Sequence, residues 1–482
     1  MSSATPLLDS FRWASLKRQA NYNLFRADTA TYLLAPTRLQ LATCLFVACF
    51  PFVGFMLVDL QPIGIPFGIT PNYIAGPLLV FFWLTRSRKL YPGVYNPISS
   101  IAWIYIAITF LSVLQSAWIP VGASDFTDKK PWTFSFTQSI YVLWVLVVFL
   151  VLCQVFSSFP SLRIKALRCH VFTGCFVALW GIYQALANFM GWTYLTVFNN
   201  SPYRAELYEG TWMGLKRINS VLLEPSDLGL YLMTVIPLLI VQFKGEEKIV
   251  NNTTRIVALI LCVTALFLST SFSVYLTFAL FLFLFLLTEQ RWKNTRVILN
   301  LAAIFLCFSA AAAMFAYFGG RYSLEQAMLE RATSSSGEAD PSTLERASTA
   351  AAALQTFADH PLIGVGEANS AFYYDQYSSM PISGDTPRVD SLLPRILAEH
   401  GLLGAALFLW LLSKIFWPYG REQQIQPSLL RSMLKLAVVV CFFDLFTSFF
   451  EIEHFHVWFL AALLFALSSR VVPAASTSES GA

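Results

Sequence analysis

The sequence predicts an all-α fold, a polytopic bundle of about twelve membrane-spanning helices with a large, partly helical outer loop. Of its 482 residues, 56% are hydrophobic and 12% are charged, whereas soluble domains average about 25% charged residues. Long uncharged runs recur between Leu39 and Leu467, and many approach the roughly 20 residues that a membrane helix needs. Lysine and arginine gather in every second connection between these runs, which is typical of cytoplasmic loops.

The predicted spans follow the apolar runs in chain order. The seventh and eighth are short, and we expect them to form a bent pair that meets at the polar turn Ser269–Ser271. The twelve predicted spans are Leu39–Leu60, Ile63–Thr85, Ile98–Ile119, Ser139–Phe159, Cys169–Met190, Pro225–Phe243, Ile256–Ser269, Ser273–Leu287, Val297–Phe318, Gly401–Phe416, Leu434–Phe450 and Val457–Leu467.

The distribution of basic residues sets the expected orientation, because cytoplasmic loops carry an excess of lysine and arginine. Both termini are then cytoplasmic. The expected organisation is a cytoplasmic tail (1–38), nine spans (39–318), an outer loop (319–400), three spans (401–467) and a second cytoplasmic tail (468–482). The basic residues that support it are Arg12, Lys17, Arg18, Arg26, Arg38, Arg86, Arg88, Lys89, Arg163, Lys165, Arg168, Lys244, Lys248, Arg255, Arg291, Lys293, Arg296, Lys414, Arg421 and Arg431.

The long outer loop is expected to contain a helix. Asp340 offers an N-cap and Pro341 suits the first helical position. Apolar residues then recur at helical spacing, and the helix should stop before His360-Pro361, since a residue that precedes proline avoids the α region. We expect a short amphipathic helix that lies on the membrane surface and covers a cavity between the spans. Its expected apolar row is Leu344, Ala347, Ala351, Leu354 and Phe357.

The first candidate site residues are Arg217, Glu224 and Asp227, which lead into the sixth span. Ionisable groups at a membrane boundary persist mainly where they face water, a partner or a substrate. The structural alternative is that Arg217 reaches lipid headgroups, while Glu224 and Asp227 only favour the N-terminus of the helix that starts at Pro225. The sequence leaves both interpretations open.

A second group of candidates lies in the long loop. Arg346 sits on its helix, where it could bind phosphate through its planar fork of donors or pair locally with a carboxylate such as Asp359. Arg395 and Glu399 are spaced to pair within one helix, beside His400. Arg388 and Asp390 precede them, and Asp390 has no such local partner on its own face.

Several classes of site are disfavoured. Asp444 is a lone carboxylate within the eleventh span, and a metal site formed by the residues after it matches no strong ligand spacing. No DxD pair, phosphate-binding glycine-rich loop or GxSxG elbow occurs, which argues against nucleotide-sugar, ATP or serine-hydrolase chemistry. The net charge of +4 comes from cations at span ends, so nucleic-acid binding is not implied. The disfavoured metal site would be formed by Glu451, Glu453, His454 and His456, which follow Asp444.

Four motifs together resemble the O-antigen ligase and O-antigen polymerase family. The most specific is Asp359-His-Pro-Leu-Ile-Gly-Val-Gly366, which is followed by Asp390-Ser391 and, after a gap of nine residues, by Gly401-Leu-Leu-Gly404. Upstream, Arg217…Glu224-Pro-Ser226 looks like the family's Arg-then-Glu-Pro motif. Twelve spans with one large outer loop before the tenth are also similar to the family.

The resemblance implies a bacterial inner-membrane enzyme that uses glycans linked to undecaprenyl pyrophosphate. Ligases of the family carry a histidine, thought to be the base, at the position that Asp390 holds here. This departure favours a polymerase of repeat units at the outer face of the inner membrane. The alternative is a ligase that transfers finished polymer to lipid A-core or to protein.

The implied reaction needs a base and cations. Asp390 or Glu224 would accept the proton of the acceptor hydroxyl, and Arg217, Arg346 and Arg388 would stabilise the departing pyrophosphate. We expect inverting transfer without metal or cofactor. The expected partners are the lipid-linked glycan, a polysaccharide acceptor, membrane lipid and, as a further candidate, a chain-length regulator.

A glycan or lipid transporter is the rival from another class, because of intramembrane Asp444 and the many spans. Transporters are typically built from internal repeats with broken helices in matching halves. The sequence shows no such symmetry, and its large loop lies on one side only.

Overall fold

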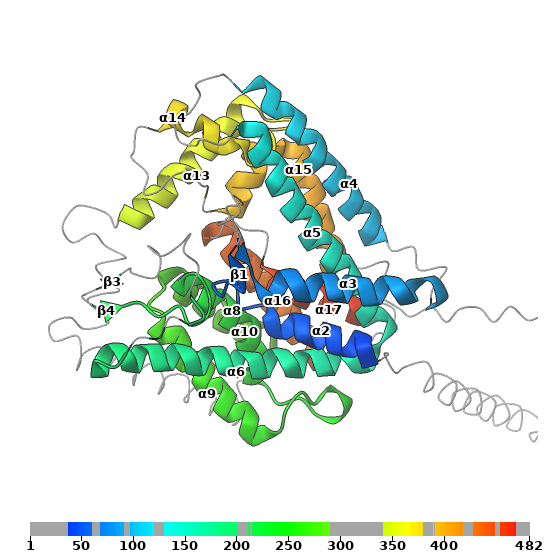
Figure 1. The fold of residues 1–482 in the computed structure, drawn as a ribbon, viewed down its shortest axis with the longest axis vertical. Helices are drawn as coiled ribbons and strands as arrows, with labels where there is room; N and C mark the ends of the chain where they lie inside the picture. Colours follow the sequence, from blue (N-terminus) through cyan, green and yellow to red (C-terminus); the bar gives the residue numbers. More distant parts are fainter. Residues whose placement is uncertain are drawn as a thin grey trace, which may run out of the picture.

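The computed structural model describes residues 37–59, 68–90, 97–119, 130–193, 195, 197–199, 211–212, 215–289, 341–378, 389, 391–417, 428–448 and 454–468. Within these residues the fold is helical, apart from two ladders of two residues per strand (Figure 1). The all-α prediction is confirmed for this part of the chain.

The first half of the chain supplies helices that begin, in most cases, at a proline, whose fixed φ suits the first helical turn. Its elements are α2 (Thr37–Cys49), β1 (Val58–Asp59), β2 (Gly68–Ile69), α3 (Pro71–Leu90), α4 (Pro97–Ser112), the 3₁₀ helix η2 (Val113–Trp118), α5 (Pro131–Ser158), α6 (Pro160–Met190), β3 (Thr211–Trp212) and β4 (Leu215–Lys216).

The second half contains the central helices and the segment between the spans. Its elements are α8 (Pro225–Ile240), the 3₁₀ helix η4 (Gly245–Glu247), α9 (Asn252–Leu268), α10 (Phe272–Glu289), α13 (Pro341–Asp359), the 3₁₀ helix η6 (Asn369–Tyr373), α14 (Tyr374–Tyr377), α15 (Leu392–Phe416), α16 (Leu429–Ser448) and α17 (Phe455–Ser468).

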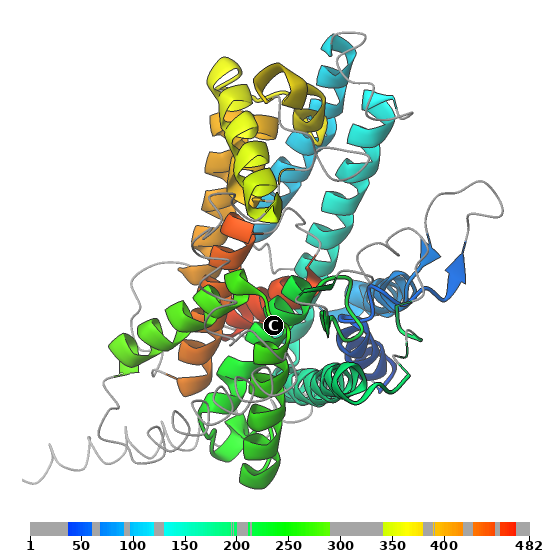
Figure 2. The ribbon, with the colours of Figure 1, turned by 90° about the vertical axis from the view of Figure 1, so that its left-hand side faces the viewer.

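The helices form two groups that share one core. In the lower part of Figure 1, α2 packs against α3 and α6, and α6 packs against α9. In the upper part, α13 packs against α15, and α15 against α4 (Figure 2). The helices α8 and α16 lie between the groups, and every residue of α8 is buried. The core therefore runs through α8, α16 and α17, and α16 contacts both α8 and α15.

Every predicted span except Val297–Phe318, which lies outside the described residues, overlaps a helix, although Leu39–Leu60 and Ile63–Thr85 also include the strands β1 and β2. The ends differ. The helix α2 stops at Cys49, before Pro51, so the first span is shorter than predicted. Among the described residues, four helical segments are long and apolar enough to cross a membrane, namely Ile98–Trp118, Pro131–Ser158, Pro160–Met190 and Leu392–Phe416. The chain is a membrane protein, and its twelve-span topology stays a prediction.

The helix predicted in the long loop is confirmed as α13, which ends at Asp359, directly before His360-Pro361. Its small residues pack on α15, because Thr349, Ala352, Ala353 and Thr356 form the buried face. The opposite face carries much of the predicted apolar row: Ala347 and Ala351 are exposed and Leu354 is 47% exposed. Within the described residues this face is largely exposed, and the placement of α13 on a membrane surface stays a prediction.

The helix α15 is broken at Gly401, whose backbone has φ 61° and ψ −163°. The break leaves helical carbonyls and amides without partners inside the helix. The segment 361–366 supplies those partners. The amides of Val365 and Gly366 donate to the carbonyls of Ala398 and Glu399 at 2.9 and 2.8 Å. On the other side of the break, the amides at 402 and 403 donate to the carbonyls at 361 and 362, at 2.8 and 3.1 Å.

This interlock between the segment 361–366 and the break in α15 explains two glycines of the Asp359–Gly366 and Gly401–Gly404 motifs. A Cβ at Gly364 would lie 2.4 Å from the carbonyl carbon of Glu399, and a Cβ at Gly401 would lie 2.5 Å from that of Leu362. Both glycines also have positive φ, which L side chains rarely adopt. The two motifs are therefore two sides of one backbone contact.

We predict that Gly401→Ala destabilises the protein by about 3 kcal/mol or more, because a clash with backbone adds to the strain of a glycine-only conformation. Gly191→Ala is the matched control. Gly191 also has positive φ (67°), but nothing lies within 4 Å of its Cβ position, so only strain of about 1–2 kcal/mol is expected. Thermal unfolding of the purified variants measures both. Equal losses would show that the interlock contributes nothing.

Candidate functional site

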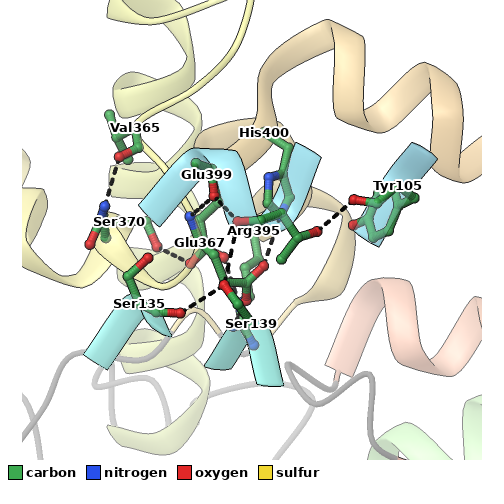
Figure 3. A network of polar contacts seen from close by, with 12 residues as sticks. Tyr105, Ser135, Ser139, Val365, Glu367, Ser370, Arg395, Glu399 and His400 are labelled. Carbon is green, nitrogen blue, oxygen red and sulfur yellow. Dashed lines mark hydrogen bonds and ion pairs between the residues drawn. The ribbon is translucent and has the colours of Figure 1, made fainter. Parts of the chain in front are cut away.

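A buried ion network lies directly on the interlock (Figure 3). The guanidinium of Arg395 binds two carboxylates, with Nη2 2.8 Å from Glu367 Oε1 and Nε 3.0 Å from Glu399 Oε2. His400 Nε2 lies 2.8 Å from the other oxygen of Glu367, and Ser370 donates to the other oxygen of Glu399 at 2.7 Å. Every carboxylate oxygen of the network therefore has a partner.

The position of each group follows from the backbone. Glu367 directly follows the interlocked Gly366, and its own amide donates to Ser112 Oγ at the end of α4, at 2.9 Å. Arg395 and Glu399 lie one turn apart on α15, and His400 follows Glu399 directly before the break at Gly401. The interlock thus brings a carboxylate from the loop against a helix that carries the complementary cation.

Further hydrogen bonds fix the loop to α4 and η2. Asn369 Nδ2 donates to Val365 O at 2.9 Å and lies 3.1 Å from Ser116 Oγ. Gln115 Nε2 donates to Gly364 O at 3.3 Å. Long-range polar contacts thus attach this part of the loop to the bundle.

The protonation of the network follows from its charges. Ionised Glu367 only accepts hydrogen bonds, so His400 Nε2 donates to it. Burial raises the pKa of the Glu367 carboxyl, but the hydrogen bond from His400 and the charge of Arg395 lower it more. The net pKa of Glu367 lies below its ordinary value, and the group is ionised at neutral pH.

Glu367, Glu399 and His400 offer ligand atoms within 4.8 Å of one another, the arrangement of a small cation site. The guanidinium of Arg395 already holds one oxygen of each carboxylate at hydrogen-bond distance. A second cation would have to displace it against charge repulsion. The network is therefore neutralised from within, and Arg395 is engaged by carboxylates.

The candidates before α8 occupy the start of that helix. Glu224 is its N-cap, and it forms a capping box with Asp227, whose Oδ2 accepts from the Glu224 amide at 3.2 Å. Arg217 is half-buried, and its Nε donates to Thr270 Oγ1 in the turn between α9 and α10, at 3.4 Å. The structural role foreseen for Glu224 and Asp227 is confirmed, and Arg217 is attached to the predicted bent pair.

The remaining candidates are less closely placed. Arg346 lies half-buried in the first half of α13, while Asp359 accepts a hydrogen bond from Tyr377. Arg388 and Asp390 lie outside the described residues. Ser391, the N-cap of α15, donates to Thr447 O near the end of α16 at 3.1 Å. Because α16 also packs on α8, this helix links the start of α15 to the core that α8 enters.

Sequence reasoning missed Glu367 and the extent of the network. The pairing of Arg395 with Glu399 is confirmed, but it is one edge of a larger cluster. The sequence did contain a signal for Glu367. This residue directly follows Gly366, the last residue of the most specific motif, and a carboxylate that is buried at such a place needs a nearby cation. Its partner lies 28 residues away in sequence, and no local spacing reveals that distance.

Comparison with known proteins adds one finding. Residues 257–409 match the family model described as O-antigen ligase. The matched region contains Glu367, Ser370, Arg395, Glu399 and His400, together with the interlock. Curated proteins gave no match.

We predict strong coupling between Glu367 and Arg395. Arg395→Ala leaves the buried carboxylates of Glu367 and Glu399 without their shared cation, which costs about 3–5 kcal/mol, whereas Glu367→Ala leaves Arg395 paired with Glu399. The double variant should lose clearly less than the sum of the two single losses, because removing Glu367 also removes one of the two carboxylates that the loss of Arg395 leaves uncompensated. A double-mutant cycle of unfolding free energies measures this coupling, and simple additivity would contradict the ion pair.

We also predict a pH dependence for Glu367. A carboxyl whose pKa is lowered on folding stabilises the protein above its ordinary value of 4.5, and this contribution is lost as pH falls through the folded pKa. The difference in Tm between the wild type and Glu367→Gln should therefore be largest at neutral pH and shrink on acidification below about 4.5. A difference that stays constant or widens in acid would contradict this assignment.

Proposed function

Because residues 257–409 make this chain a member of the O-antigen ligase family, we propose that it polymerises lipid-linked oligosaccharide repeat units. Family membership implies lipid-linked glycan and polysaccharide substrates. The observation that favours a polymerase over a ligase is Asp390. By the resemblance described above, the family's ligases have a histidine at this position. The proposed carrier lipid is undecaprenyl pyrophosphate, and the products are O-antigen, capsule or exopolysaccharide chains.

The proposed reaction is an inverting transfer. A hydroxyl of the acceptor sugar attacks the anomeric carbon of the lipid-linked glycan, and the bond from that carbon to the pyrophosphate oxygen breaks. Asp390 or Glu224 takes the hydroxyl proton as general base. The pyrophosphate leaves with its electron pair and its charge is stabilised by arginine side chains, in a reaction that needs no metal.

Arg217, in the segment that leads into α8, supports pyrophosphate binding there. It is half-buried, and a guanidinium presents several planar donors that suit phosphate. Arg346 and Arg388 are proposed to complete the site from the loop. Arg395 is excluded from this role, because two carboxylates already occupy its guanidinium.

Glu224 is a weaker candidate base than Asp390. The Glu224 side chain already accepts from the first turn of α8 and from Ser226 Oγ at 3.1 Å. A base needs an oxygen that the acceptor hydroxyl can reach. We therefore assign the base to Asp390 and the positioning of the α8 start to Glu224.

The proposed location is the bacterial inner membrane, with the transfer site at its outer face and both termini inside. Contacts of the basic residues support this orientation. Arg163, Arg168 and Arg255 donate to carbonyls at 156, 249 and 239, at 2.6, 2.7 and 2.7 Å. These contacts tie together the ends of α5, α6, α8 and α9 opposite the Glu224 end of α8.

A ligase is the second candidate, favoured by the description of the matching family model. It would use the same lipid-linked donor but pass a finished polymer to lipid A-core or to protein. The two enzymes differ in what accumulates when they are removed. Loss of a polymerase leaves single repeats on the carrier lipid, whereas loss of a ligase leaves long chains there.

We predict that Asp390→Asn lowers polymer formation by about 10²–10⁴-fold, the usual contribution of a general base, and that Arg217→Ala shortens or abolishes polymer through lost charge stabilisation. Polysaccharide from strains that carry each variant is compared on gels at equal membrane abundance. Asp375→Asn is the control, because Asp375 is an exposed carboxylate of α14 in the same loop.

Full-length polymer in both variants would overturn the site. Long chains on the carrier lipid in the Asp390→Asn strain would instead identify a ligase. Single repeats on the carrier, with normal polymer in the Asp375→Asn strain, are the result that a polymerase requires.

A further inference from the structure

A second group of buried polar side chains lies in the core, where three helices meet. The rings of His170 in α6, Tyr231 in α8 and His456 in α17 form a continuous column. The centroids of His170 and Tyr231 are 5.3 Å apart, and those of Tyr231 and His456 are 5.4 Å apart, both with edge-to-face geometry. None of these residues belongs to the proposed transfer site.

The hydrogen bonds of His170 fix which of its nitrogens carries the proton. Thr234 has one hydroxyl proton, and it is donated to Tyr231 O at 2.6 Å. The bond of 2.8 Å between His170 Nε2 and Thr234 Oγ1 must therefore be donated by the imidazole. In the neutral ring, Nδ1 is then an acceptor, and it has no hydrogen-bond partner among the described residues.

Two further buried polar atoms of the column also lack a hydrogen-bond partner among the described residues. Within the part of the chain that the structure describes, neither Tyr231 Oη nor His456 Nε2 has a hydrogen-bond partner. The exposed fractions are 0% for His170, 0% for Tyr231 and 3% for His456, so bulk water does not reach them. Buried polar groups in proteins are nearly always hydrogen-bonded, so three such atoms in one column call for an explanation.

The aromatic neighbours of His170 do not supply a partner for its Nδ1. The ring of His170 faces Phe50 and Phe459, with centroids at 6.3 and 5.3 Å. Aromatic carbon offers no conventional donor to an imidazole nitrogen. One acceptor, one phenol that can both donate and accept, and one further imidazole nitrogen remain, which is the set of two to four polar partners that a buried water needs.

We propose that His170, Tyr231 and His456 bind ordered water inside the bundle. The water accepts a hydrogen bond from Tyr231 Oη and donates its two protons to His170 Nδ1 and to an unprotonated His456 Nε2. Tyr231 lies one turn below Asp227 on α8, at the i, i+4 spacing of one helix face. The site is therefore a hydrated, polar interior beneath the start of α8, and it does not depend on the proposed transfer reaction.

Replacing Tyr231 by Phe separates a hydrated column from a dry one by the sign of the effect on stability. In a dry column the hydroxyl is an unsatisfied buried group, so its removal raises Tm or leaves it unchanged. In a hydrated column the removal takes a partner from the bound water, and Tm should fall by roughly 2 °C. Thermal unfolding of the purified full-length protein in lipid nanodiscs measures this shift.

Tyr275→Phe is the matched control. Tyr275 is a half-buried tyrosine of α10 whose hydroxyl donates to Phe267 O. The Tyr275→Phe variant therefore shows how far Tm falls when a hydrogen-bonded hydroxyl is removed. A rise or no change for Tyr231→Phe, beside a fall for Tyr275→Phe, overturns the proposal.

A second measurement decides the question if the Tyr231→Phe variant does not fold. An experimental map of the wild-type protein that resolves ordered water should show a peak within hydrogen-bond distance of Tyr231 Oη and His170 Nδ1. An empty site in such a map overturns the proposal, and so does a metal ion at that position.

Discussion

The break in α15 at Gly401 is the constraint on which the polar half of this molecule depends. A membrane helix normally satisfies its own backbone groups, because the bilayer offers no water to do so. Here two carbonyls and two amides are released at the break and are taken up by the segment 361–366. Non-helical backbone is tolerated at such a place only where protein covers it. The segment 361–366 is that cover.

The ion network is a consequence of this backbone contact. Glu367 directly follows the interlocked residues, and Arg395, Glu399 and His400 lie just before the break. Because every carboxylate oxygen has a donor, the buried charges are compensated. An uncompensated buried carboxylate would cost several kcal/mol. The network therefore holds the loop in one register against α15.

Most of the fold could be predicted from the sequence, because apolar runs report helices directly. The helix α13 was predictable to its last residue, since His360-Pro361 marks its end. The side of α13 that packs against protein was not, because the packing on α15 selects small residues such as Ala352 and Thr349 over the apolar row.

In the candidate sites, too, contacts between residues close in sequence could be predicted, and contacts between distant residues could not. The role of Glu224 at the start of α8 follows from Glu224-Pro225, a local signal, and it is confirmed. The pair of Arg395 and Glu399 is also local and is confirmed. The contact of Glu367 with Arg395 and the column of His170, Tyr231 and His456 join residues far apart in sequence. Only the packing of the helices brings them together, and spacing along the chain carries no trace of it.

The central proposal is that this membrane protein joins lipid-linked repeat units to one another. Its most direct test is reconstitution of the purified full-length chain in liposomes with lipid-linked single repeats and no nucleotide. The predicted result is a ladder of longer lipid-linked chains, with release of one carrier pyrophosphate for each bond formed. Repeats that stay single, while preformed polymer is passed to an added lipid A-core acceptor, would contradict it.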